Sequence, residues 1–261
     1  MVIMSDMTVA IWTEEAVSNK EGWLRAAHDA VGKLEDQLDV EIDTWMPSSN
    51  PDLWSPFIPD VSQPDSWDWI LKNFGEYVED NWDVEDTEYH LILIDELGTD
   101  PGAGYTKGDV NDGPNPFQDW GLNTSMAAIG GVNVAVKAYE NRFKPYGGHG
   151  SKAFKATVMH EILHSLSGYN GIGDENRPAR PCDESNGDLD HSLGGIYTWD
   201  DPHSVSPFLL WYTGGDWFSG NGSPCTTCRD HPNANTGDIS FELSRCTKDY
   251  VNQHIDIKNT L

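Results

Sequence analysis

The segment from Phe154 to Gly171, FKATVMHEILHSLSGYNG, constrains the fold of this 261-residue chain more than any other stretch. It carries His160, Glu161 and His164 within an otherwise apolar run. The apolar residues recur at helical spacing, which predicts a buried amphipathic helix. Imidazole and carboxylate groups are costly to bury unless they bind a partner. The fold therefore has to place this helix beside something that these side chains can bind.

Helical geometry brings the two histidines to one face of the helix. Positions i and i+4 differ by about 400° of rotation, so His160 and His164 can bind one tetrahedral zinc ion at about 2.0–2.1 Å. Glu161 lies about 100° around the helix from His160, where its carboxylate can reach a water molecule on the metal. This is the H-E-x-x-H spacing of zinc peptidases, and it predicts Zn²⁺ as the cofactor. The alternative is a pair of core histidines with ordinary hydrogen-bond partners.

The patterns that precede this helix predict an α+β lobe. Period-two or continuous apolar runs predict strands, and apolar residues at helical spacing predict helices. The predicted strands are MTVAIW (7–12), DVEIDTW (39–45), EYHLILIDEL (88–97) and SMAAIGGVNVAV (125–136), and the predicted helices are EGWLRAAHDAVGKLEDQL (21–38) and DSWDWILKNFGEYVEDN (65–81). Proline and glycine predict loops at 46–64 and 98–123.

Two regions differ in composition. We assign residues 1–171 to an N-terminal α+β lobe that ends in the H-E-x-x-H helix. Residues 172–261 are rich in Asp, Gly, Pro, Asn and Ser and contain all four cysteines, which predicts an irregular C-terminal lobe. The cleft between the two lobes is the expected site.

The residues HEILHSL resemble the active-site helix of the zincin metallopeptidases, in particular those of metzincin-like architecture. The resemblance implies a twisted mixed sheet with two backing helices, the motif helix as the floor of a cleft, and an irregular lobe below it. It also implies that a strand near Ala127–Val136 is the sheet edge against which an extended peptide pairs. A strict metzincin continues H-E-x-x-H-x-x-G-x-x-H, whereas this chain has Ser167 and Asn170 at the last two positions. All six methionines lie at or before Met159, so a methionine turn cannot follow the helix.

A catalytic zinc ion needs a third protein ligand and an open position for water. His191, in GDLDHSLGG, is our first candidate, since imidazole is a frequent zinc ligand. The sequence D-H-x-L-G after the zinc helix is also similar to the third-ligand segment of some distant metzincin-like peptidases. The alternatives that stay open are Glu184, Asp174 and His203.

Tyr212 is a further candidate for the catalytic site. It ends the segment HSVSPFLLWY, in which Ser206-Pro207 predicts a turn that replaces the methionine turn. By resemblance to the tyrosine that follows this turn in some metzincins, Tyr212 would approach the substrate oxyanion. The alternative is a buried core tyrosine, because its neighbours are apolar.

The four cysteines, Cys182, Cys225, Cys228 and Cys246, allow three pairings if all are oxidised. Two disulfides would stabilise a lobe that has little apolar material of its own, and they favour an extracellular location. The start of the chain, MVIMSDMTVAIW, has neither the basic region nor the long apolar core of a signal peptide. A structural metal or free thiols are the alternatives to disulfides.

The charge balance narrows the classes of partner. The chain has 43 acidic and 16 basic residues and a net charge of −27, which disfavours nucleic acid and anionic membranes as partners. No apolar run approaches the roughly 20 residues of a membrane span. The carboxylates are dispersed along the sequence, and this composition resembles that of proteins from salt-loving organisms, which predicts a halophilic protein.

These observations together predict a zinc-dependent endopeptidase that acts on a peptide or protein substrate. Zinc held by His160, His164 and His191 would activate a water molecule, and Glu161 would act as the general base. One alternative is a non-catalytic secreted binding module that presents aromatic side chains among Trp54, Trp67 and Trp69. The other is a zinc hydrolase that acts on a substrate other than a peptide.

The charge balance predicts that added salt stabilises the fold. The Debye length falls from about 10 Å at 0.1 M salt to about 3 Å at 1 M, so repulsion among the carboxylates weakens. We expect the free energy of unfolding to rise by about 2 kcal/mol between 0.1 M and 2 M KCl, which raises Tm by roughly 4–8 °C in a domain of this size. Thermal unfolding followed by circular dichroism measures the shift. A Tm that stays constant or falls with KCl would contradict halophilic adaptation.

Overall fold

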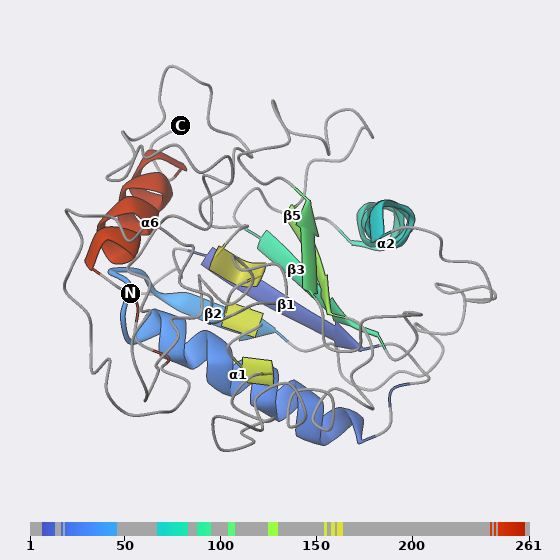
Figure 1. Cartoon of the computed structure of the whole chain (residues 1–261). Coiled ribbons are helices and arrows are strands. Elements are labelled where there is room, and N and C mark those ends of the chain that lie inside the picture. The colour runs from blue at the N-terminus through green and yellow to red at the C-terminus, as the bar shows by residue number, and fades with distance from the viewer. Residues whose placement is uncertain are drawn as a thin grey trace, which may run out of the picture.

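The computed structural model describes residues 7–13, 17, 19–45, 67–82, 88–94, 104–107, 125–129, 154–155, 158–159, 161–163, 241, 243 and 245–258. Within these ranges no helix combines the length and the apolar character that crossing a bilayer requires. The helices and strands are arranged as in Figure 1. In chain order they are β1 (Met7–Thr13), α1 (Lys20–Glu35), β2 (Ile42–Trp45), α2 (Trp67–Asn81), β3 (Glu88–Leu93), β4 (Gly104–Lys107), β5 (Ser125–Ile129) and α6 (Arg245–Lys258).

The five strands form one mixed sheet in the order β2-β1-β3-β5-β4. The pairs β1–β2, β1–β3 and β3–β5 are parallel, and β4 runs antiparallel to β5. The predicted strands at 7–12, 39–45 and 88–97 are confirmed as β1, β2 and β3, with shorter bounds for β2 and β3. The predicted strand at 125–136 is confirmed over 125–129.

Two expectations about the far side of the sheet are wrong. The composition of residues 98–123 predicts a loop, but β4 lies within this range because its four residues, GYTK, are too few to show a periodic pattern. The resemblance to metzincins places the sheet edge at a strand near Ala127–Val136, yet β5 pairs with β3 on one side and with β4 on the other. Among the described strands, the edge on this side is therefore β4.

The two crossover helices lie on opposite faces of the sheet. The β1–α1–β2 connection runs outward across the sheet, and the β2–α2–β3 connection runs back over β1. Right-handed crossovers in opposite directions put their helices on opposite faces. Accordingly, Leu34 of α1 packs with Val9 of β1, whereas Phe74 of α2 contacts Trp12 on the other face of that strand.

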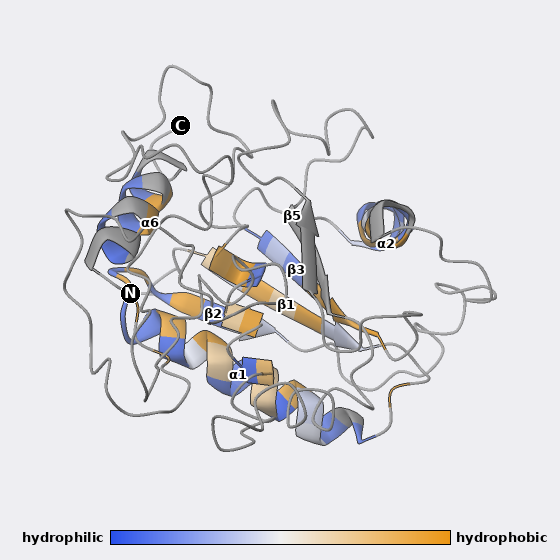
Figure 2. Cartoon of the chain, in the orientation of Figure 1, coloured by the Kyte–Doolittle hydropathy of each residue, from blue (hydrophilic) through white to orange (hydrophobic). Residues whose placement is uncertain are grey.

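The face of the sheet that α1 covers carries the main hydrophobic core. Alternate residues of the strands, such as Val9 and Ile11 in β1 and Leu91 and Leu93 in β3, contribute to it. Figure 2 shows hydrophobic residues along β1 and on one side of α1. The residues of α1 in this core are Ala27, Ala30, Val31 and Leu34, at the spacing of one helical face.

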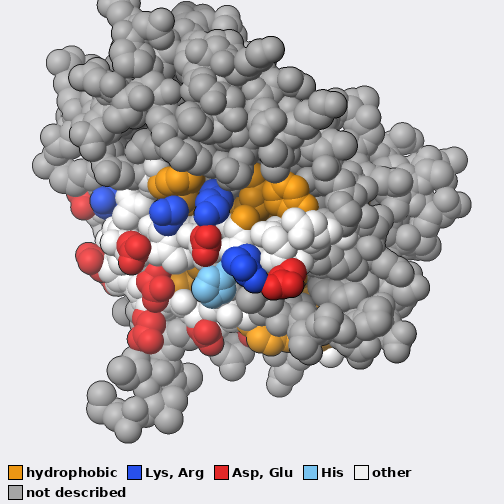
Figure 3. Space-filling model, turned by 90° about the horizontal axis from the view of Figure 1, so that it is seen from below, with side chains coloured by type: hydrophobic (Ala, Val, Ile, Leu, Met, Phe, Trp, Pro, Cys, Tyr) orange, Lys and Arg blue, Asp and Glu red, His pale blue; other side chains and the backbone are white. Residues whose placement is uncertain are grey.

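The outward face of α1 is polar. In Figure 3, which views the molecule from below Figure 1, acidic side chains are interspersed with lysine and arginine. Arg25 pairs with Glu21 one helical turn earlier, and both side chains are exposed. Exposed pairs of this kind contribute about 0–1 kcal/mol, so burial of the inner face holds α1 in place.

The last helix, α6, belongs to the same core. Val251 and Ile255 are buried in it together with Leu243. Gln37, just after α1, donates from Nε2 to the carbonyl of Phe241 at 2.8 Å, and its Oε1 accepts from the backbone N–H of Leu243 at 2.7 Å. A regular helix thus lies within residues 172–261, for which the composition predicts an irregular lobe.

A second polar contact joins α6 to the turn after α1. The backbone N–H of Asp39 donates to Oδ1 of Asn252 at 3.0 Å, and Asn252 Nδ2 donates to Asp39 Oδ2 at 3.2 Å. Both contacts are exposed, so the part-buried Gln37 bonds contribute more to holding α6.

Replacing Gln37 with Ala should destabilise the fold by about 1–3 kcal/mol, because the backbone groups of Phe241 and Leu243 lose a part-buried partner. Urea unfolding measures the change. Asn81→Ala is the matched control, since Asn81 Nδ2 also donates to a backbone carbonyl, that of Tyr77, but on the surface. The control should change stability by less than about 0.5 kcal/mol. Equal effects of the two variants would contradict the role given to Gln37.

Candidate metal centre

The segment that carries the H-E-x-x-H motif is helical wherever the structure describes it. Phe154–Lys155, Val158–Met159 and Glu161–Leu163 all have helical backbone, which confirms the predicted helix at those positions. His160 and His164 lie outside the described residues. So do the other candidates, namely His191, Tyr212, Glu184, Asp174 and His203.

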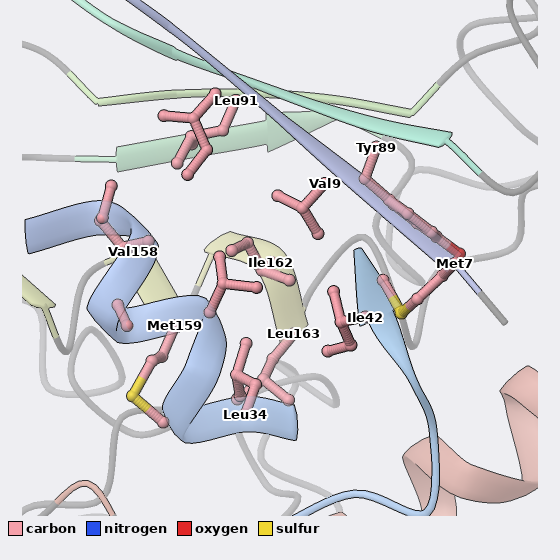
Figure 4. Close-up of a cluster of buried hydrophobic side chains, with 14 of the residues drawn as sticks. Met7, Val9, Leu34, Ile42, Tyr89, Leu91, Val158, Met159, Ile162 and Leu163 are labelled. Atoms are coloured by element: carbon pink, nitrogen blue, oxygen red, sulfur yellow. The ribbon is translucent and has the colours of Figure 1, made fainter. Parts of the chain in front are cut away.

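One side of this helix is embedded in the main core. Phe154, Val158, Met159, Ile162 and Leu163 are each no more than 2% exposed. At 100° per residue these five positions cover an arc of about 180°. Figure 4 shows the last four of them among Leu34 of α1 and Val9 and Leu91 of the sheet. The helix therefore packs between α1 and the sheet, on the face opposite α2.

Comparing the free energies of apolar burial and of the ion pair with α1 shows which of them fixes the motif helix in this position. Burying one large apolar side chain contributes about 1.5–3 kcal/mol, and this helix buries five. Polar contact with α1 adds less. Lys155 Nζ lies 2.9 Å from Asp29 Oδ2, but the Asp29 side chain is 51% exposed, and exposed pairs contribute about 0–1 kcal/mol. Apolar packing holds the helix, while the ion pair constrains its first turn.

The Lys155–Asp29 pair changes the pKa of the aspartate. The hydrogen bond from Lys155 lowers the pKa of Asp29 below its usual value, and the charges of Lys155, His28 and Lys33 act in the same direction. The pair therefore stabilises the fold above about pH 4, where the unfolded aspartate is ionised, and this contribution is lost as the pH falls through the lower pKa. The first turn of the motif helix stays tied to α1 at neutral pH.

Glu161 is the described member of the motif, and it is 2% exposed. If Phe154 is set at 0° and each residue adds about 100°, Glu161 lies at about −20° on the helix circumference. This position is next to the arc of about 0° to 180° that the five buried apolar residues cover. Helical periodicity thus places Glu161 at the border between the arc that packs in the core and the rest of the helix circumference. A carboxylate at such a margin can be shielded from bulk water by the core and still reach a group beside the helix.

The described residues include Glu161 but neither of the proposed histidine ligands. Among the described residues, no three His, Cys, Asp or Glu side chains lie close enough together to hold a metal. Cys246 is described through its backbone in α6, and the other cysteines lie outside the described ranges. The chemistry of the motif itself fits zinc, because two imidazoles four residues apart on a helix supply two of the ligands that zinc prefers.

Sequence analysis gives no role to another buried histidine, His90 in β3, which is 3% exposed. A polar residue inside the apolar run EYHLILIDEL is the signal that could have identified it. It lies on the sheet face covered by α2, away from the motif helix.

Comparisons with models of protein families, with curated proteins and with solved structures give no match to this chain. The candidate centre therefore rests on the motif and on the packing of the helix that carries it.

Packing of the motif helix is tested by Ile162, which is 2% exposed. Replacing Ile162 with Ala should lower the free energy of unfolding by about 2–5 kcal/mol, and Ile162→Val by about 0.5–1.5 kcal/mol. Urea unfolding in the presence of a chelator measures both without any contribution from bound metal. If Ile162→Ala unfolded at the same urea concentration as the parent chain, the helix could not be packed as described.

Proposed function

We propose that this chain is a zinc-dependent endopeptidase. His160 and His164 would hold the metal, with His191 as the first candidate for the third ligand and Glu161 as the general base. The observation that supports the proposal is the burial of Phe154, Val158, Met159, Ile162 and Leu163 on one arc of the motif helix, because helical spacing predicts that positions 160 and 164 fall outside that arc. The substrate class is a peptide or protein, because H-E-x-x-H with this arrangement is typical of zinc peptidases.

The helical arc supports the assignment of the two ligands. The buried residues, Glu161 included, occupy about 200° of the helix circumference when positions are spaced by 100°. The same spacing predicts positions 160 and 164 about 40° apart in the remaining arc. A pair of ordinary core histidines would be expected within the buried arc instead. This difference favours ligands over core packing.

The residues of the motif divide the chemistry between them. When bound, zinc acts as a Lewis acid and lowers the pKa of its water towards about 7. Glu161 accepts the proton of that water, directs the oxygen to the scissile carbonyl, and passes the proton to the leaving amine. Tyr212 is proposed to donate a hydrogen bond to the oxyanion as it develops.

The sheet supports a binding mode for an extended peptide. Peptides add to sheets through edge strands, where backbone groups are free to pair. Among the described strands β4 is the edge beside β5, it is antiparallel to its neighbour, and it belongs to the sheet on which the motif helix packs. We therefore place the substrate backbone along β4, in place of the strand at 127–136.

The remaining features of the proposal follow from composition. We propose disulfides among the four cysteines, an extracellular location and a requirement for salt, and no nucleic acid or membrane partner. Their support is the cysteine-containing segment of low apolar content and the net charge of −27.

Replacing Glu161 with Gln should abolish peptide hydrolysis and leave zinc bound, because the amide keeps the shape of the side chain but cannot accept the proton. We expect kcat/KM to fall by about 10²–10⁴-fold or more, measured with a mixed peptide library. Zinc content by atomic emission serves as the readout of the metal. Glu76→Gln is the control, since Glu76 is exposed on α2, and its activity should match the parent chain. Full activity of Glu161→Gln would refute the mechanism.

The same assay separates the alternatives. A chain that binds zinc and cleaves no member of the library would favour a zinc hydrolase with another substrate. A chain without zinc would favour the binding module.

A further inference from the structure

The sheet face opposite the motif helix encloses His90 in an aromatic cluster. The centroid of the His90 ring lies 6.0 Å from that of Trp12 on β1 and 6.4 Å from that of Phe74 on α2. Trp12 also contacts Trp45 of β2, at a centroid distance of 5.3 Å, and Trp82, just after α2, at a centroid distance of 4.7 Å. Since Trp12 is fully buried, this cluster joins three strands to α2 through one indole.

One hydrogen bond fixes the tautomer of His90. Trp12 Nε1 donates to His90 Nδ1 over 3.1 Å. An indole N–H can only donate, so Nδ1 must be unprotonated, and the neutral imidazole carries its hydrogen on Nε2. That tautomer also disfavours a metal at Nε2, because neutral imidazole binds metals through its unprotonated nitrogen.

The other ring nitrogen has a carboxylate nearby but no hydrogen bond. Among the described residues, His90 Nε2 is buried without a hydrogen-bond partner. Glu88 Oε2 lies 3.6 Å away, which is too far for a hydrogen bond. The side chain of Glu88 is 26% exposed, whereas that of His90 is 2% exposed, so a shift of the ring towards Glu88 is a shift towards the surface.

A second proton changes which neighbour the ring can bind. Both nitrogens of an imidazolium are donors, so a protonated Nδ1 would face the indole N–H and the bond to Trp12 would be lost. The positive charge would at the same time attract the carboxylate of Glu88. Protonation therefore replaces Trp12, a partner inside the aromatic cluster, with Glu88, a partner nearer the surface.

We propose that His90 is a pH-dependent switch that exchanges the indole of Trp12 for the carboxylate of Glu88 when it is protonated. The Trp12 bond requires an unprotonated Nδ1. Its contribution to stability is therefore present while the ring is neutral and is lost when the ring is protonated. Because Trp12 packs on residues of β2 and α2, loss of this bond loosens that side of the sheet.

Other ionisable groups among the described residues lie near this face. The strand register puts Asp43 of β2 in the cross-strand row of Glu88, and Lys107 of β4 in the row of His90, two strands away. On α2, Tyr77 contacts Trp82, and burial raises the pKa of its hydroxyl, which keeps it neutral in the range in which histidine titrates. Within the described part of the chain, Glu88 is the carboxylate paired with His90.

Nitrogen-15 NMR of the full chain, labelled in its histidine and tryptophan side chains, tests the switch. At pH 8 we expect the Nε2–H tautomer for His90. As the pH is lowered from 8, the Trp12 indole resonance, assigned by its absence in Trp12→Phe, should move together with the protonation of His90. The Nδ1–H tautomer, or an indole resonance that does not change over this range, would overturn the proposal.

Two variants separate the switch from general damage to the cluster. Trp12→Phe removes the donor, so His90 should become protonated at a pH higher by roughly half a unit or more. Glu88→Gln removes the attracting charge, so protonation should need a pH lower by roughly the same amount. Shifts in the same direction for both would overturn the proposal. If a variant fails to fold, the tautomer and titration of the parent chain decide the outcome.

Discussion

The packing of the Phe154–Leu163 helix between α1 and the sheet is the constraint on which the rest of the structure depends. Five apolar side chains of this helix enter the main core, and their burial outweighs the exposed Lys155–Asp29 pair several-fold. An embedded arc of this width fixes the rotation of the helix about its axis. The position of Glu161 beside that arc, and the free arc predicted for both histidines, follow from the same packing.

The chain returns to this core at its C-terminal end. Leu243 and α6 share the core with the motif helix, and Gln37 bonds to the backbone on both sides of residue 242. Leu163 and Phe241, the described residues on either side of 164–240, therefore both lie at the main core. Under the proposed function, the segment that contains the third ligand starts and finishes beside the core that holds the motif helix. A ligand far along the sequence, such as His191, then needs no separate domain to reach the metal.

Local periodicity predicts most of the described elements but little of their arrangement. The strands β1 and β3 and the helices α1 and α2 have long, regular apolar patterns. β4 has four residues, and among the described side chains of α6 the core contains Val251 and Ile255, so neither element has a pattern strong enough to detect. The opposite faces of α1 and α2 follow from strand order and crossover handedness, which no single segment contains. The same limit applies to the site, because the sequence around His191 and Tyr212 has no periodicity that could orient their side chains.

The central claim is that a single divalent ion is bound by imidazoles on the motif helix. Zinc X-ray absorption of the purified chain, after zinc loading and removal of loose metal, tests this most directly. The account predicts about one zinc per chain with at least two nitrogen ligands at about 2.0–2.1 Å, and loss of that zinc in the His160→Ala and His164→Ala variants. A chain that retains no zinc, or that retains it unchanged in both variants, would contradict the account.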